Sequence, residues 1–192
     1  MVGKFIVFEG IDGSGKSTQI KKLADYLFDQ DKKNIILLTR EPTKISPAGL
    51  EMRKRLAEDK NPKENAEAYT RLYLEDRKYH VEHIIKPALA AGITVLCDRY
   101  KYSTIIYQTA QGMDTSKIIA MHEGMPVPNL VIIIDVPIKM ALLRMDRKTE
   151  VFEKADFLEE LRRGYLNLPR YISNERMMII DVKNLTIESA GA

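Results

Sequence analysis

The segment Gly10–Ser17 near the start of the chain has the spacing of a phosphate-binding loop. It fits the pattern G-x-x-x-x-G-K-[ST] without a mismatch. Glycines let such a loop bring backbone N–H groups against phosphate oxygens, and the helix N-terminus that follows adds partial positive charge. Lys16 then reaches the β- and γ-phosphates of a nucleotide, and the Ser17 hydroxyl becomes a ligand of Mg²⁺. The alternative is a glycine-rich turn before a helix, but the full pattern arises by chance in only about one chain in a hundred.

Charged residues also follow two later apolar segments of the chain. Asp98-Arg99-Tyr100 comes after one segment, and Thr39-Arg40-Glu41-Pro42 comes after the other. If the segments are parallel strands, both groups lie at the carboxyl edge of a sheet, where open α/β folds bind ligands. Asp98 is then placed to hold Mg²⁺ through water or to orient a nucleophile, and Arg99 to clamp a phosphate. A simple ion pair at the strand end is the alternative.

Five short apolar runs, separated by helical stretches, indicate how these residues are positioned. The runs are Phe5–Phe8, Ile35–Leu38, Thr94–Cys97, Leu130–Ile134 and Met178–Ile180. They do not alternate with polar residues, which is typical of strands covered on both faces of a parallel sheet. Apolar residues recur at helical spacing from Ile20 to Phe28, so the first strand, this helix and the second strand form a βαβ unit. The sequence predicts a three-layer α/β fold around a parallel sheet.

Capping patterns and prolines predict three further helices. They begin at Asn61-Pro62-Lys63-Glu64, after Asp135-Val136-Pro137, and at Asp156. The first is expected to end at Lys86 because Pro87 disfavours continuation, and Pro169 follows the end of the last. The chain has no internal repeat or flexible linker, so we expect a single domain over residues 1–192.

Composition and charge exclude several classes of protein. The chain of 192 residues is 45% hydrophobic and 30% charged, which is typical of a globular protein. Its longest wholly apolar run, Leu130–Ile134, is too short to span a membrane, and its N-terminus lacks a signal-peptide pattern, so we expect a cytoplasmic protein. The net charge of +3 suits a phosphorylated substrate and gives no reason to expect nucleic acid. The lone Cys97 cannot form an internal disulfide.

Motors, GTPases and small kinases all contain a phosphate-binding loop of this kind, so other features must separate them. The sequence has no guanine-reading N-K-x-D motif, and Asp12-Gly13 belongs to the loop rather than to a D-x-x-G switch. Large ATPases need a longer chain. A small phosphotransferase remains.

Taken together, the motifs resemble the thymidylate kinase family. The matching segments are Phe5–Thr18, Thr39–Pro42 and Asp98–Tyr100, followed by Ser103 and Tyr107-Gln108. The match runs in order over most of the chain, thins after about Lys148, and is closest in character to archaeal or bacterial members. Membership implies a P-loop nucleotide kinase fold with a five-stranded parallel sheet, helices on both faces and a lid. It also implies phosphoryl transfer from Mg²⁺-bound ATP to dTMP, usually by a homodimer.

The resemblance assigns roles residue by residue. The acceptor-binding helical insertion covers about residues 43–92, and the lid about 144–156. The catalytic residues are Lys16, Arg99, Arg147 and Asp12, and the metal ligands are Ser17 and Asp98. The ATP-binding residues are Gly10, Ile11, Asp12, Gly13, Ser14, Gly15, Lys16, Ser17, Thr18 and Arg144. The dTMP-binding residues are Arg40, Arg53, Tyr73, Arg77, Asp98, Arg99, Thr104, Tyr107 and Gln108.

Some acceptor residues are assigned particular contacts by the same resemblance. Tyr73 takes the place of the aromatic residue that stacks on thymine, usually Phe, and Arg77 that of the arginine that reads a base carbonyl; the alternative for Tyr73 is a core aromatic. Tyr107 resembles the tyrosine that crowds the ribose 2′ position and favours the deoxy sugar. Arg53 resembles an arginine on the acceptor phosphate. Thr43-Lys44 replaces two glycines that often follow Arg-Glu-Pro, so the loop is expected to differ there.

A basic cluster lies near the expected lid. Arg144, Arg147 and Lys148 share one helix face. An inserted arginine stabilises the charge that develops during phosphoryl transfer, and Arg147 is preferred for that role. The alternative is that these cations complement a helix C-terminus. Other arginines, expected on solvated helix faces, are Arg162, Arg163 and Arg170.

Two other functions stay open at this point. One is a nucleotide or nucleoside kinase with another acceptor, such as dUMP, UMP, CMP or a deoxynucleoside. The other is a non-catalytic nucleotide-binding regulator, against which the intact set of Lys16, Asp98 and Arg99 argues. The side chains given no chemical role, of which the cysteine and the methionines are expected to pack in the core, are Cys97, Met177, Met178, His80, His83 and His122.

Overall fold

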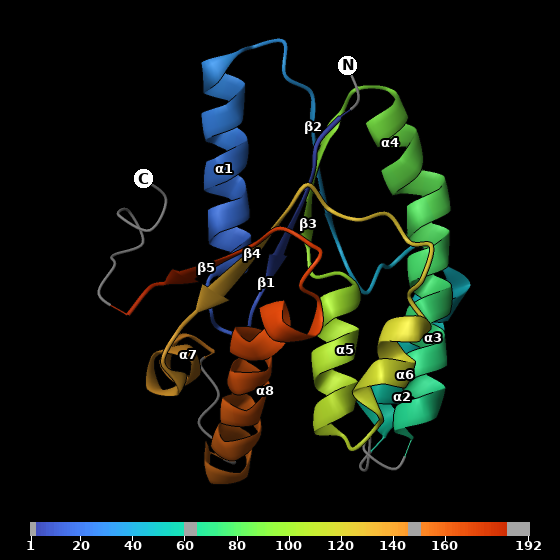
Figure 1. Cartoon of the computed structure of the whole chain (residues 1–192), viewed down its shortest axis with the longest axis vertical. Coiled ribbons are helices and arrows are strands. Elements are labelled where there is room, and N and C mark those ends of the chain that lie inside the picture. Colours follow the sequence, from blue (N-terminus) through green and yellow to red (C-terminus); the bar gives the residue numbers. More distant parts are fainter. Residues whose placement is uncertain (1–2, 60–64, 146–150, 184–192) are drawn as a thin grey trace.

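A parallel sheet with helices around it forms the centre of the protein (Figure 1). The structure is a computed structural model, and it describes residues 3–59, 65–145 and 151–183. The five strands lie in the order β2-β3-β1-β4-β5, and every neighbouring pair is parallel. Their bounds are β1 (Phe5–Glu9), β2 (Ile36–Arg40), β3 (Thr94–Asp98), β4 (Leu130–Asp135) and β5 (Met177–Asp181). The predicted α/β fold with a five-stranded parallel sheet is therefore confirmed.

Each strand ends in a charged residue, and these ends lie at one edge of the sheet. The terminal residues are Glu9, Arg40, Asp98, Asp135 and Asp181. The apolar runs in the sequence stopped one or two residues earlier, because a charged side chain interrupts a run while the backbone pairing continues through it. The carboxyl edge, where such folds bind ligands, is thus lined with charge.

The hydrophobic core is built on the three central strands. Val7 in β1, Val95 in β3 and Val131 in β4 are fully buried, and so is Cys97, as predicted. The edge strands differ: Leu38 in β2 is 45% exposed, and Met178 in β5 is 47% exposed. The prediction that all five strands are covered on both faces, with Met178 in the core, is wrong at these edges, because the helices pack over the middle of the sheet.

Helices cover the sheet from both sides. The helix α1 (Lys16–Gln30) packs on β1, β2 and β3. On the other side in Figure 1 runs one continuous helix made of α3 (Ala66–His80), η1 (Val81–Ile85) and α4 (Lys86–Ala90). Within this long helix, α4 contacts strand β3 of the sheet. The helices on both faces agree with the predicted three layers.

The long helix does not stop at Lys86, so that prediction is wrong. A turn of π-helix, η1, precedes Pro87, and the Lys86 N–H donates to the carbonyl of Val81 rather than to that of Glu82. The wider turn relieves the clash that a proline ring otherwise makes with the carbonyl four residues earlier. The helix then continues through Pro87 to Ala90. The predicted helix start at Asn61-Pro62-Lys63-Glu64 lies outside the described residues.

Five shorter or later helices complete the described part of the chain. They are α2 (Pro47–Glu58), α5 (Lys101–Ala110), α6 (Thr115–Ala120), α7 (Ile138–Arg144) and α8 (Val151–Tyr171). The helix predicted after Pro137 is confirmed as α7. The start predicted at Asp156 and the end predicted before Pro169 are wrong, because α8 already contains both residues. Asp156 is exposed, so its capping pattern lies on the solvent side of a longer helix. No helix in residues 3–59, 65–145 or 151–183 is long and apolar enough to cross a membrane.

Candidate functional site

The loop between β1 and α1 has the backbone of a phosphate-binding loop. Gly10 and Gly13 have φ angles of 136° and 76°, in the region that favours glycine. A Cβ atom at Gly10 would lie 2.6 Å from the carbonyl oxygen of Ile134, and one at Gly13 would lie 2.4 Å from that of Ala141. The loop is therefore pressed against the end of β4 and against α7, and side chains at these two positions do not fit.

Lys16 lies across this loop and is almost fully buried. Its Nζ atom donates to the carbonyl oxygens of Gly10 at 3.0 Å and Ile11 at 2.9 Å. Burial is the main cause that lowers the pKa of the Lys16 ammonium to about 8, and the nearby positive charge of Arg99 contributes to the same shift. The loop thus holds one buried ammonium group, which the carboxylates of Asp98, Asp12 and Glu9 stabilise in part. Phosphate oxygens would add negative charge at the same place.

Ser17 and Asp98 form the part of the site that fits a divalent cation. The Ser17 hydroxyl donates to Asp98 Oδ2 at 3.0 Å. The other carboxylate oxygen, Asp98 Oδ1, is buried without a hydrogen-bond partner among the described residues. The described part of the chain contains no cluster of three His, Cys, Asp or Glu side chains that would hold a metal alone. This donor set fits Mg²⁺, which keeps several waters and takes one or two protein oxygens together with phosphate oxygens.

Arg99 lies at the turn from β3 into α5, next to the phosphate-binding loop. Its φ angle is 72°, which is uncommon for a residue other than glycine and is found at functional sites. Nη1 donates to the hydroxyls of Ser103 at 2.9 Å and Tyr165 at 3.0 Å. Nη2 donates to Asp12 Oδ1 at 2.8 Å and to the Tyr107 hydroxyl at 3.3 Å. The guanidinium is therefore fixed by α5, α8 and the phosphate-binding loop.

Glu9, the last residue of β1, holds the turn that carries Arg99. Its carboxylate is fully buried and accepts from the backbone N–H groups of Tyr100 at 2.8 Å and Ser103 at 3.2 Å. The Ser103 hydroxyl donates to the other oxygen at 2.7 Å. Burial raises the pKa of the Glu9 carboxyl, against which Arg99 and these hydrogen bonds act. The carboxylate thus caps the N-terminus of α5 and fixes the strained turn.

A cavity opens beside Arg99. Its lining comes from the loop after β1, the segment after β2, α3, and the β3–α5 turn with the start of α5. The lining residues are Asp12, Glu41, Pro42, Tyr73, Arg77, Arg99, Tyr100, Ser103, Thr104 and Tyr107. Three tyrosine rings, two guanidinium groups and one apolar proline suit a planar base joined to an anionic group.

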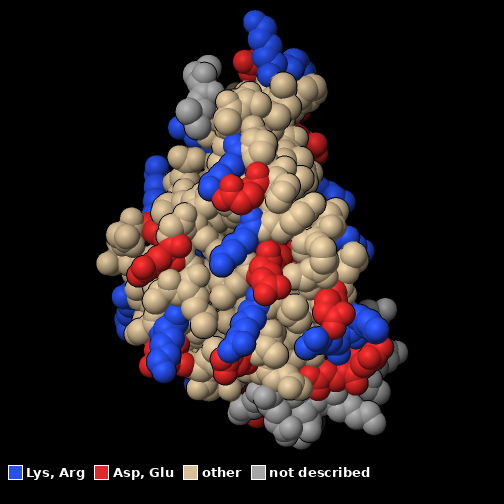
Figure 2. All heavy atoms as spheres, turned by 90° about the vertical axis from the view of Figure 1, so that its right-hand side faces the viewer, with Lys and Arg blue, Asp and Glu red and all other residues tan. Residues whose placement is uncertain are grey.

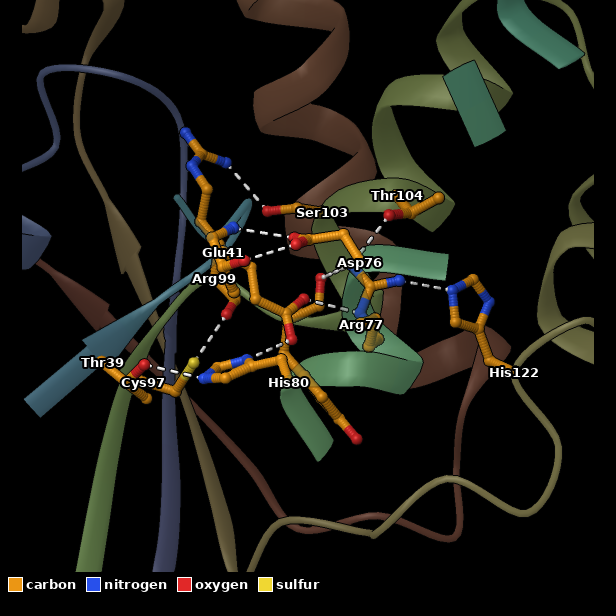
Figure 3. A network of polar contacts seen from close by, with 12 residues as sticks. Thr39, Glu41, Asp76, Arg77, His80, Cys97, Arg99, Ser103, Thr104 and His122 are labelled. Carbon is orange, nitrogen blue, oxygen red and sulfur yellow. Dashed lines mark hydrogen bonds and ion pairs between the residues drawn. The ribbon is translucent and has the colours of Figure 1, made fainter. Parts of the chain in front are cut away.

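Arg77 lies at the inner end of this cavity and is 1% exposed. Its Nε donates to Glu41 Oε2 at 2.6 Å, and its Nη2 donates to the Tyr100 carbonyl at 3.1 Å and to Thr104 Oγ1 at 3.0 Å. His80, one turn further along the same helix, contacts the other Glu41 oxygen through Nδ1 at 2.9 Å. Figure 3 shows these side chains converging from the segment after β2, from α3 and from α5.

The helix α3 also holds the segment in which Thr43-Lys44 stands. The Thr43 N–H and the Thr43 and Ser46 hydroxyls donate to the Asp76 carboxylate, the first at 2.7 Å. Arg53 donates through Nη2 to the Pro42 carbonyl at 2.8 Å. A threonine at position 43 therefore supplies two donors to a buried carboxylate. Of these two donors, the hydroxyl is the one that a glycine at this position would lack.

The other expected site residues lie in several different places. Arg144 lies on the phosphate-binding loop, with Nη1 3.3 Å from the Gly13 carbonyl oxygen. Arg40 is exposed and Gln108 is buried, and neither is among the residues that line the cavity. Arg147, expected in the lid, lies outside the described residues. Arg53 is also absent from the lining and contacts the Pro42 carbonyl instead. The remaining residues expected to bind ATP or dTMP lie in the loop, next to it, or on the cavity wall.

Several residues of the site were given no role of their own from the sequence. They are Glu9, Glu41, Ser103, Tyr165 and His122. Glu9 and Glu41 had one usable signal, because each is an acidic residue within three positions of an expected strand end. Arg162 was expected on a solvated face, but it donates to both oxygens of Asp135 at 2.5 and 2.8 Å and is only 28% exposed. That expectation is wrong, since a strand-end carboxylate draws the guanidinium inward.

Comparison with known proteins gives one consistent result. Residues 8–190 match the family model described as thymidylate kinase. A probable thymidylate kinase from Pyrococcus horikoshii is 40% identical over 184 residues, which cover 93% of this chain and 88% of the relative. A thymidylate kinase from Desulfotalea psychrophila is 37% identical, with 95% and 96% covered. The crystal structure of thymidylate kinase from Ehrlichia chaffeensis superposes with a TM-score of 0.79 at 30% identity, and covers 100% of this chain and 96% of that one.

Proposed function

Because this chain belongs to the thymidylate kinase family, we propose that it transfers the γ-phosphoryl group of ATP to dTMP and so forms ADP and dTDP. The observation that carries the proposal is the position of Arg99 between two half-sites. The phosphate-binding loop is the donor half-site, and the cavity is the acceptor half-site. The guanidinium of Arg99 contacts Asp12 of the phosphate-binding loop and also lines the cavity that holds Tyr73 and Arg77. Donor and acceptor phosphates that occupy these half-sites meet at one edge of the sheet.

On the donor side, the loop from Gly10 to Thr18 binds the phosphates of ATP. Backbone N–H groups and the N-terminus of α1 bind the phosphate oxygens. Lys16 exchanges the carbonyl oxygens of Gly10 and Ile11 for the β- and γ-phosphates, which raises its lowered pKa and keeps it charged. Arg144, already within reach of the loop carbonyls, extends this positive surface from α7.

Ser17 and Asp98 are the residues that would hold Mg²⁺. The unpartnered Asp98 Oδ1 supports this assignment, because a buried carboxylate oxygen is costly without a donor or a cation beside it. When bound, the ion neutralises charge on the β- and γ-phosphates. Asp98 also holds the Ser17 hydroxyl in place through its other oxygen.

On the acceptor side, the side chains of the cavity bind the nucleoside monophosphate. Tyr73 stacks on the base, Arg77 and Thr104 lie at its polar edge, and Tyr107 lies against the sugar. Arg99 binds the acceptor phosphate in line with the donor. Arg53, fixed on the Pro42 carbonyl, supports the phosphate from α2. Burial raises the pKa of the Tyr73 phenol, and the positive charges of Arg99, Arg77 and Arg53 act against that rise. Arg40 and Gln108, which the resemblance also assigns to dTMP, are not among the residues that line this cavity.

Closure of the lid, about residues 144–156, completes the proposed cycle. A closed lid excludes water, so that ATP transfers its phosphoryl group to dTMP rather than to water. Arg147 is the arginine that the proposal places on the transferring group. The division of the domain into an acceptor-binding insertion at about 43–92 and this lid is part of the same proposal.

A homodimer, a cytoplasmic location and the lack of a nucleic-acid partner also belong to the proposal. The family resemblance supports the first two. The third is supported by the face shown in Figure 2, where Lys and Arg side chains are interspersed with Asp and Glu instead of forming a continuous basic surface. The net charge of +3 agrees with this distribution.

An acceptor screen tests the proposed function directly. ADP formation from Mg²⁺ and ATP is measured with dTMP, dUMP, UMP, CMP and thymidine in turn, each against a reaction without acceptor. We expect the highest kcat/KM with dTMP, because the cavity offers donors to a base carbonyl and little room at the sugar. A higher kcat/KM with UMP or CMP would reassign the acceptor, and ADP formation that no acceptor changes would refute a kinase.

A further inference from the structure

A buried hydrogen bond joins Arg77 to a histidine that belongs to none of the sequence motifs. His122 lies directly beyond α6, 45 residues from Arg77, and is 4% exposed. Its Nε2 atom is 2.7 Å from Arg77 Nη1, and its Nδ1 atom is 2.7 Å from the Ile118 carbonyl oxygen. Figure 3 shows the imidazole at the end of the guanidinium that is opposite to Glu41.

The two contacts fix where the imidazole carries its proton. A guanidinium group only donates hydrogen bonds, so Nε2 must accept from Arg77. A carbonyl oxygen only accepts, so Nδ1 must carry the hydrogen that goes to Ile118. His122 is therefore a neutral imidazole with its proton on Nδ1, because a protonated ring would point a second N–H at Arg77.

The surroundings keep the ring neutral. Burial and the positive charges of Arg77 and Lys101 lower the pKa of His122 to about 3, while its hydrogen bond to the Ile118 carbonyl acts in the opposite direction. The ring therefore stays an acceptor across the range in which the folded protein works.

The contact also determines how much of Arg77 is left for a ligand. A guanidinium has five N–H groups. Glu41, the Tyr100 carbonyl and Thr104 take three of them, and His122 takes a fourth. Among the contacts of the described residues, one N–H on Nη1 remains. Arg77 lines the cavity, so this group is the one available to a bound base.

We propose that His122 is a positioning residue, which holds Nη1 of Arg77 so that its remaining N–H donates to a carbonyl of the base and thereby favours thymine over cytosine. The proposal rests on the proposed function. Thymine has a carbonyl at position 4, which accepts, whereas cytosine has an amino group there, which donates. A fixed donor fits the first and opposes the second. A guanidinium that is free to rotate discriminates less, because its N–H can turn away from the amino group of cytosine.

Steady-state kinetics of three variants test this role. His122→Phe keeps a ring of similar size but removes the acceptor. His122→Gln keeps an amide oxygen near the position of Nε2. His83→Phe is the matched control, because His83 is exposed and its contacts among the described residues are with the carbonyl and ring of Tyr79 on its own helix. For each protein, KM for dTMP, KM for ATP and the dTMP/dCMP ratio of kcat/KM are measured.

We expect His122→Phe to raise KM for dTMP and to lower the dTMP/dCMP ratio, each by roughly tenfold, as for loss of a hydrogen bond to a charged group. KM for ATP stays within about twofold, because the phosphate-binding loop is untouched. His122→Gln recovers most of the loss, and His83→Phe resembles the unmodified protein. An equal rise in both KM values, or no recovery with Gln, would show a structural role only and overturn the proposal.

The tautomer gives a second test that needs no substitution. Nitrogen-15 NMR of the histidine rings distinguishes a proton on Nδ1 from one on Nε2. We expect His122 to show the Nδ1–H form without titration between pH 5 and pH 8. The Nε2–H form, or titration in that interval, would overturn the proposal even if dTMP is the substrate. Failure of the unmodified protein to phosphorylate dTMP would instead refute the proposed function, so the two failures are distinguishable.

Discussion

The donor loop and the acceptor cavity lie next to each other at the carboxyl edge of the sheet, yet they are built in opposite ways. The loop is one continuous stretch of chain that binds through its own backbone, and Lys16 contacts carbonyls only five and six residues away. The cavity is assembled from side chains of several elements, and its central ion pair joins Arg77 to Glu41, 36 residues away. Phosphate, which is common to all nucleotides, is bound by backbone N–H groups and nearby cations. A particular base needs polar side chains held in fixed directions.

The largest expected effect comes from the continuous half-site. Lys16→Ala removes the single ammonium group that the loop encloses, and we expect kcat to fall by about 10³-fold, as when one preorganised donor is removed from a site of developing charge. Lys21→Ala, on the exposed side of the same helix, is the control. ADP release at saturating dTMP is the measurement. Unchanged kcat in Lys16→Ala would end the assignment of this loop to catalysis.

The dispersed half-site is expected to respond through stability as well as through binding. Glu41→Gln removes a buried negative charge from between Arg77 and His80 and leaves the guanidinium uncompensated. Breaking a buried ion pair in this way destabilises a protein by about 3 kcal/mol or more. Urea unfolding measures the change, and Glu51→Gln, which breaks the exposed pair with Arg55, is the control with little effect.

Equal unfolding free energies for the two Glu→Gln variants would contradict the comparison. They would mean that the cavity wall gains no stability from its charge network. A loss of stability with an unchanged KM for dTMP would separate the structural part of the network from its part in binding.

The same contrast explains which features the sequence allowed us to predict. The parallel sheet follows from uninterrupted apolar runs, and the loop from a contiguous motif whose glycines have a steric cause. The contacts of Glu9, Glu41 and His122 join residues that are far apart in the chain, and no local spacing records them. Two helix ends were also mispredicted, at Pro87 and Pro169, because proline is a local signal that a wider turn or the last helical turn can accommodate.

The turn that carries Arg99 was only partly predictable from the sequence. The dipeptide Asp98-Arg99 and its place at a strand end were visible in the sequence, and the structure has both residues at the carboxyl edge. The positive φ of Arg99 and the carboxylate of Glu9 that stabilises the turn were not, because backbone strain depends on packing from neighbouring strands. The local pattern indicated which residues to examine, and tertiary contacts determine where their side chains point.

The pH dependence of the donor half-site gives a prediction of intermediate size. The pKa of Lys16 is lowered from 10.5 to about 8 in the free protein. The charged form binds phosphate, so kcat/KM for ATP is expected to fall as pH rises above about 8, by about tenfold for each further pH unit. At saturating ATP the bound phosphates hold the charge, so kcat stays constant to higher pH. A kcat/KM for ATP that is constant to pH 10 would contradict the lowered pKa.

As pH rises, Lys16 is expected to affect the stability of the fold and the binding of ATP in opposite directions. Between about pH 8 and pH 10.5 the unfolded chain retains the Lys16 proton that the folded protein has released. Because the unfolded state binds more protons in this interval, the contribution of Lys16 to stability rises with pH while ATP binding weakens. Comparison of wild type with Lys16→Met in urea unfolding at pH 7.5 and pH 9.5 measures this contribution. It is contradicted if the difference in unfolding free energy does not change with pH.

The smallest effect is expected at Tyr107, where the acceptor cavity acts by shape rather than by charge. Its ring lies 5.3 Å from the Arg99 guanidinium and edge-on to Phe157, so Tyr107→Phe keeps the surface that would meet a 2′-hydroxyl and loses only a long hydrogen bond of 3.3 Å. We expect the dUMP/UMP ratio of kcat/KM, which isolates the 2′ position on one base, to change less than about threefold in Tyr107→Phe. In Tyr107→Ala it should fall by about tenfold, because rejection of one misfitted group is worth about 1–3 kcal/mol. If all three proteins have the same ratio, this wall does not select the sugar, and the discrimination made in the cavity lies with the base alone.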